Sequence, residues 1–109
     1  MGNALTALEN QYFLINGNFG NLYAQCATDD QKAALQQQLT TARTNYWSAI
    51  NKVLHDDDPR VQSLTSQMNT LKLTLQATID SGQNIAAVLG AIAQAVGVGT
   101  QLAALAISL

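Results

Sequence analysis

The chain has 109 residues, a length that fits one domain with one hydrophobic core, and we expect residues 1–109 to form a single domain. Charged residues make up only 11% of it, against roughly 25% in typical soluble domains, while hydrophobic residues make up 48%. The net charge of −2 and the scattered cations argue against a nucleic-acid partner. A surface so poor in charge favours self-association or cover by a partner.

The beginning of the sequence shows no basic stretch followed by an apolar run, so we expect no cleaved secretory signal. This expectation fits a soluble chain that is cytoplasmic or exported by another route. Cys26 is the single cysteine, which excludes an internal disulfide and leaves a small buried apolar side chain, which we favour, or a link between two chains.

The first predicted helix runs from about Ala4 to Cys26, with Asn3 as a plausible N-cap. Its apolar residues recur at alternating intervals of three and four, which places them on one face. This face consists of Leu5, Leu8, Tyr12, Ile15, Phe19, Leu22 and Cys26. Gly17 and Gly20 allow a break, since Asn-Gly between apolar runs is also a hairpin signal. The apolar spacing resumes beyond them without a slip, which favours a continuous or kinked helix.

The second predicted helix begins after Thr28 and runs to about Leu54. Thr28 has the chemistry of an N-cap, and Gln31 is placed to reach back toward it, as in a capping box. The seam of this helix and of the following one consists of Leu39, Tyr46, Val53, Leu64, Leu71 and Leu75.

The most secure boundary is at the acidic turn that ends in Pro59. Asp58 is the predicted N-cap and Pro59 the first helical residue, where the missing N–H is harmless. The third helix then extends to about Asp80. His55 and the three aspartates after it could bind a cation, but consecutive carboxylates point in different directions, and a solvated capping turn explains them better.

The stretch from Ser81 to Asn84 is compatible with two topologies. If Gly82 caps one helix and Asn84 starts another, the chain forms an all-α, antiparallel up-down bundle of four helices with coiled-coil-like packing. If the helix continues, the unbroken apolar register gives a bundle of three helices with a long, kinked third one. We favour the four-helix bundle because it closes within one chain.

The last segment, from Ile85 to Leu109, contains no charged residue and is long enough to span a bilayer. It lacks the aromatic and basic flanks of membrane helices, so we expect it to pack against protein instead. Gly97 and Gly99 lower its helix propensity by about 2 kcal/mol together and predict a bend or an end there. A short final helix from Thr100 to Leu109 would follow.

Catalytic signatures are absent from the sequence. His55 is the single histidine and Glu9 the single glutamate, so neither a hydrolytic triad nor a helix-borne di-iron site is available. We therefore expect a protein that is not an enzyme and that has no cofactor and no resident metal.

The leading hypothesis is a non-enzymatic assembly or interaction protein that self-associates or binds a helical partner through its C-terminal segment. The expected interface residues are Ile85, Leu89, Ile92, Val96, Leu102 and Leu105. The alternative is a small membrane-active protein, such as a pore, lysis or toxin component, whose uncharged tail inserts into bilayers. Aromatic residues predict core packing between the first two helices, with Arg43 placed to stack on Trp47. If Phe13 and Trp47 are exposed, they instead mark a partner site.

Overall fold

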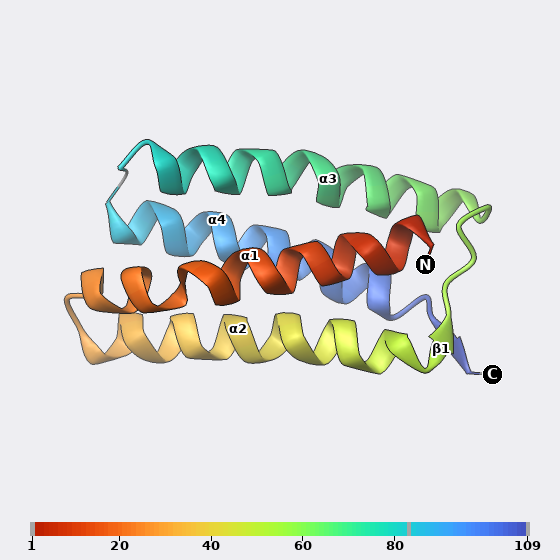
Figure 1. Ribbon diagram of the computed structural model, residues 1–109, viewed down its shortest axis with the longest axis horizontal. Coiled ribbons are helices and arrows are strands. Elements are labelled where there is room, and N and C mark those ends of the chain that lie inside the picture. Colours follow the sequence, from red (N-terminus) through yellow and green to blue (C-terminus); the bar gives the residue numbers. More distant parts are fainter. Residues whose placement is uncertain (1, 83, 109) are drawn as a thin grey trace.

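The computed structural model describes residues 2–82 and 84–108 and shows four long helices side by side (Figure 1). They are α1 (Asn3–Gln25), α2 (Asp29–Ile50), α3 (Pro59–Asp80) and α4 (Ile85–Ala103). The chain reverses direction at each connection, so that α1 and α3 run one way and α2 and α4 the other. The all-α, antiparallel up-down bundle of four helices is thereby confirmed.

The order of the helices around the bundle differs from their order along the chain. The neighbouring pairs are α1 and α2, α2 and α4, α4 and α3, and α3 and α1, while α2 and α3 are not in contact within the described ranges. The connection between α2 and α3 therefore crosses the end of the bundle diagonally. As a result, α1 and α4 also touch across the centre, and α1 lies beside α3 in a parallel pair.

The predicted helix starts depend on local side-chain caps, which the structure shows for three helices. The hydroxyl of Thr28 accepts from the N–H of Gln31 at 3.1 Å, and the Gln31 side chain accepts in return from the N–H of Ala27. Asp58 caps α3, and the Asn84 side chain accepts from the N–H of Ala87 at 2.9 Å. These bonds satisfy orphan N–H groups of the first turns, so the short signals in the sequence suffice to start the helices.

The start of α1 depends on a distant residue instead. The helix begins at Asn3, with Gly2 at the N-cap position, so the prediction that Asn3 is the cap was wrong. Both carboxylate oxygens of Asp56 accept from the first turn, one from the N–H of Asn3 and one from that of Ala4, each at 3.0 Å. A residue of the acidic turn thus caps α1 from more than fifty positions away, which no local pattern indicates.

The second helix is shorter than predicted. It ends at Ile50 and not near Leu54, and the residues that follow form the two-residue strand β1 (Lys52–Val53). This strand pairs antiparallel with β2 (Ile107–Ser108), with Val53 opposite Ile107. Val53, predicted on the seam of the second helix, therefore lies half-buried in a strand. The pairing partner is distant in the sequence, so helical periodicity could not reveal it.

The glycines within α1 and α4 do not interrupt these helices, whereas Gly82 lies in the turn that follows α3. Gly82 has a φ of +72°, a left-handed conformation that L side chains rarely adopt, and the chain turns there. The long-third-helix alternative is therefore wrong. The predicted end of the helix at Gly97 or Gly99 is also wrong, because α4 continues through both to Ala103 and no separate helix follows within residues 104–108.

The core consists of two apolar clusters separated by a polar layer. On three helices a polar residue stands between the clusters: Gln11 on α1 and Asn45 on α2, which are buried, and Thr100 on α4, which is exposed. The Nε2 of Gln11 donates to the carbonyl oxygen of Ala95 at 2.7 Å, and the Nδ2 of Asn45 donates to the hydroxyl of Thr100 at 3.1 Å. These bonds tie α1 and α2 to α4 and fix the register of the helices, since a misaligned layer would leave buried polar groups unpaired.

Gly99 is part of this layer. A Cβ atom at this position would lie 2.5 Å from the Oε1 of Gln11, so the absence of a side chain lets the Gln11 amide lie against α4. The same Oε1 is buried and has no hydrogen-bond partner among the described residues. Gly99 therefore serves the close approach of α1 and α4 and does not end the helix.

Candidate interaction surfaces

The predicted interface residues of the C-terminal segment lie mostly inside the bundle. Ile92, Val96 and Leu102 are buried in the chain's own core, two in the cluster around Leu22 and Leu35 and one in the cluster around Leu8. The other three, Ile85, Leu89 and Leu105, are half-buried and pack against the same clusters. A contact through all six would require the bundle to open. In the closed chain, an interface on α4 must use other positions.

The outward face of α4 is uncharged and consists of small or short polar residues. Its exposed positions are Ala86, Ala87, Gly90, Ala93, Gln94, Gly97, Thr100 and Gln101. The two glycines of this face, Gly90 and Gly97, border open space, since a Cβ at either would meet nothing within 4 Å. The helix is long and apolar enough to cross a membrane, with a mean hydropathy of 1.6 and one third of the span buried in the bundle.

The outer side of α1 and α2 carries the second surface, where aromatic side chains gather. Phe13 and Trp47 are 54% and 55% exposed, and the ring of Tyr46 lies between the two helices, 6.2 Å from Tyr12 and 6.3 Å from Phe13. The guanidinium of Arg43 lies 5.2 Å from the Trp47 ring, as predicted. Both aromatic residues named in the sequence analysis are exposed, which is the arrangement expected of a partner site.

Electrostatics add one defined interaction to this surface. The Tyr46 hydroxyl donates to Oε2 of Glu9 at 2.7 Å. This hydrogen bond, followed by burial and the negative charge of Glu9, raises the pKa of Tyr46 above its usual value of 10. The phenol therefore stays protonated at neutral pH and holds the carboxylate in place.

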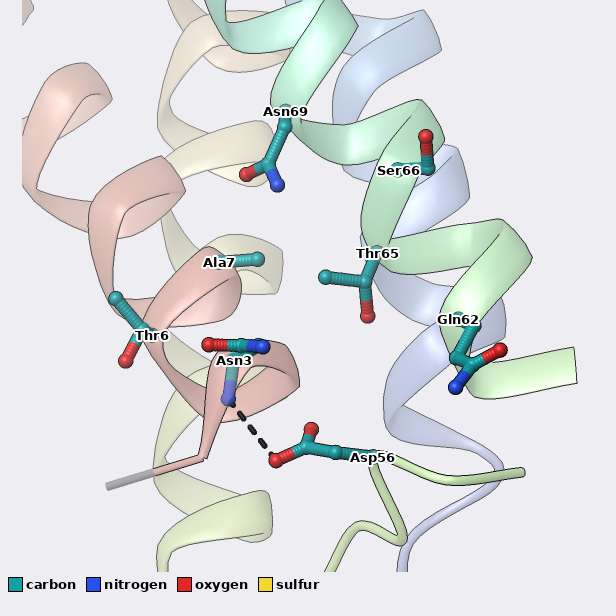
Figure 2. Close-up of a pocket in the computed structure, with 8 residues that line it drawn as sticks. All are labelled: Asn3, Thr6, Ala7, Asp56, Gln62, Thr65, Ser66 and Asn69. Atoms are coloured by element: carbon teal, nitrogen blue, oxygen red, sulfur yellow. Dashed lines mark hydrogen bonds between the residues drawn. The ribbon is translucent and has the colours of Figure 1, made fainter. Parts of the chain in front are cut away.

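A polar groove of about 360 Å³ lies between α1 and α3, next to the acidic turn (Figure 2). Its lining consists of Asn3, Thr6, Ala7, Asp56, Gln62, Thr65, Ser66 and Asn69. Asp56 is the one ionisable residue of this lining, and both of its oxygens are engaged by the first turn of α1. The groove therefore offers amide and hydroxyl hydrogen bonds but no pair of groups for acid–base or nucleophilic catalysis.

The acidic turn is occupied by structural interactions. Asp56 caps α1, and Asp58 caps α3 while pairing with Arg60 at 2.9 Å. The hydrogen bonds from the Arg60 side chain lower the pKa of the Asp58 carboxyl to about 2. Within the described ranges no three His, Cys, Asp or Glu side chains come together as metal ligands. The acidic turn thus caps two helices, α1 and α3.

Comparisons with protein-family models, with curated proteins and with solved structures find no match to this chain. Any function must therefore be argued from its own surfaces. The sequence pointed to the exposed aromatic pair and to the C-terminal segment. It did not indicate the polar groove, because its walls come from three separate segments, nor which face of α4 is turned outward.

Proposed function

We propose that the protein is a non-enzymatic assembly protein that self-associates or binds a helical partner through its apolar C-terminal helix, α4. The observation that carries the proposal is the outward placement of Gly90 and Gly97. A glycine inside a helix costs about 1 kcal/mol relative to alanine, and neither residue has a turn or a close contact within the described chain to justify this cost. A second helix packed on this face would supply a reason, because small residues let two helix backbones approach closely.

The composition of α4 supports the same proposal. Its outward face has no charge to resist burial, and its large apolar residues hold the helix rigidly on the core, so the face is presented without reorganisation. The contact surface of the closed bundle then consists of Ala86, Gly90, Ala93, Gly97 and Gln101, in place of the inward residues first expected.

The test is the molar mass of the purified chain, measured by light scattering over a wide range of concentration. We expect the mass to rise above that of a monomer with increasing concentration. Ala93→Glu places a charge in the middle of the outward face and should remove the part of the association that uses α4, so that its mass rises less with concentration than that of the wild type. Gln67→Glu, at an exposed position on α3, is the matched control and should leave the association unchanged. A wild-type chain that stays monomeric at every concentration would refute self-association through α4.

A second function, membrane activity, is favoured by one specific observation: α4 has the length and hydropathy of a membrane-spanning helix. Insertion would need the bundle to open, because Ile92, Val96 and Leu102 face the core. The assay is dye release from neutral and anionic lipid vesicles. Leakage that is lost in Ala93→Glu but retained in Gln67→Glu would favour this function. Intact vesicles at high protein-to-lipid ratio would exclude it.

A further inference from the structure

Large apolar side chains are exposed on one side of the molecule more than on the others. Of the five that are prominently exposed among the described residues, Phe13, Trp47 and Ile50 project from the outer side of α1 and α2. Together with Tyr46 and Arg43 they form what we call the aromatic surface. Trp, Tyr and Arg are the residue types that contribute most to binding energy at protein interfaces. This surface lies on different helices from the outward face of α4 and is independent of the function proposed above.

The aromatic surface carries one positive and one negative group. Arg43 is held over the Trp47 ring, and its guanidinium takes part in none of the hydrogen bonds or ion pairs formed within residues 2–82 and 84–108. Glu9 is held by the hydroxyl of Tyr46, which occupies one of its carboxylate oxygens. The two charges thus have fixed positions on neighbouring antiparallel helices.

We propose that the aromatic surface binds a second copy of this chain in a two-fold symmetric dimer. A two-fold axis parallel to the helices, running between α1 and α2, lays α2 of each copy across α1 of the other. Since Tyr46 contacts both Glu9 and Phe13, these residues lie at the same height along the bundle as the segment Arg43–Trp47. Arg43 and Trp47 of one copy therefore face Glu9 and Phe13 of its partner, and the same contacts occur twice.

Charge complementarity selects a second copy over other partners. A uniformly acidic partner would pair with Arg43 and be repelled by Glu9, and a basic partner would do the reverse. A second copy presents a carboxylate to each guanidinium and a guanidinium to each carboxylate, while the exposed rings of Phe13 and Trp47 cover one another.

Charge reversal provides the test. Glu9→Arg alone places two cations opposite each other in the dimer, and Arg43→Glu alone places two carboxylates opposite each other. We expect each variant to weaken dimerisation at least about tenfold. An equimolar mixture of the two variants matches every charge again and should form a heterodimer, which native mass spectrometry distinguishes from either homodimer. Ala93→Glu is present in every sample, so that association through α4 does not contribute.

Two further variants keep the proposal falsifiable if a charge reversal disturbs folding. Trp47→Ala removes an exposed ring and should abolish the dimer, whereas Leu73→Ala, an exposed apolar residue on α3, should leave it intact. Circular dichroism checks that each variant is helical. A dimer that survives Trp47→Ala, or two folded charge-reversal variants that stay apart when mixed, would overturn the proposal. If Ala93→Glu by itself removes the association that uses α4 while the aromatic dimer is retained, that result supports the function proposed for α4 and leaves the dimer of the aromatic surface standing.

Discussion

Substitution of Gly99 by alanine tests the close packing of α1 against α4. In an open helical position this change stabilises a protein by about 1 kcal/mol, because alanine has the higher helix propensity. At Gly99 the new Cβ would lie 2.5 Å from Oε1 of Gln11 and 3.4 Å from Cε of Met68. The Gln11 amide would have to move away and lose its 2.7 Å hydrogen bond to Ala95.

The expected magnitude follows from these two effects. Loss of a hydrogen bond from a buried amide, with its donor left unpaired, costs about 1–3 kcal/mol. Subtracting a propensity gain of about 1 kcal/mol leaves a net destabilisation of about 1 kcal/mol for Gly99→Ala. Gly97→Ala, two residues earlier and open to solvent, raises the helix propensity without displacing a neighbouring side chain. The two variants should therefore differ by about 2 kcal/mol in their free energy of unfolding.

Urea denaturation followed by circular dichroism measures both values, with an unchanged slope showing that both variants unfold as the wild type does. A double variant isolates the cause. In the Gln11→Ala background the obstructing atoms are gone, so Gly99→Ala should there be neutral or stabilising. If Gly99→Ala proves as stable as Gly97→Ala in the wild-type background, the packing of Gln11 against Gly99 is not as described.

Three other substitutions test the helix caps, the core and the acidic turn. Ile92→Ala should lower the free energy of unfolding by about 2–5 kcal/mol, since its side chain is fully buried in the chain's own core; a loss of less than 1 kcal/mol in urea denaturation would place it elsewhere. Asn84→Ala should cost about 1 kcal/mol in the same assay because it removes the acceptor for the N–H of Ala87, whereas Asn84→Asp should cost little. Asp58→Asn keeps a capping oxygen but does not titrate. The pKa of Asp58 is lowered from 3.8 to about 2 in the folded chain. The ionised carboxylate therefore stabilises the folded chain above about pH 4, and this stabilisation is lost as the pH falls toward 2. The variant should lose less stability than the wild type over that range, and parallel pH profiles would contradict the assignment.

Short-range signals in the sequence predicted much of the architecture. The three-four spacing of apolar residues predicted a helical bundle of three or four helices. Thr28 and Asp58 marked two helix starts, and Asn84 a third in the favoured alternative, because an N-cap bonds only to its own first turn. Gly82 allowed a turn between the last two helices without requiring one, and its left-handed conformation in the structure decided between the two topologies. The same reasoning predicted a protein that is not an enzyme, and this stays a prediction.

Other features required the tertiary structure, because they depend on contacts between distant segments. The cap of α1 comes from Asp56, and the strand that shortens α2 pairs with residues 107–108. Glycine propensity predicted a bend or an end of the helix near Gly99, but the burial of Val96 and Leu102 before and after it and its fit against Gln11 outweigh a local preference of about 1 kcal/mol, and the helix continues.

The candidate surfaces divide in the same way. The sequence determined that the C-terminal helix is uncharged and apolar and that Phe13 and Trp47 would mark a partner site if exposed. Only the folded chain decided whether the face of α4 that carries its large apolar residues packs inside this chain or against a partner, because the apolar spacing in the sequence is the same in both cases. Packing buried Ile92, Val96 and Leu102, left Gly90 and Gly97 on the outside, and brought Glu9 and Arg43 onto one surface. These are consequences of the helix order α1, α2, α4, α3, which the diagonal connection across the end of the bundle sets.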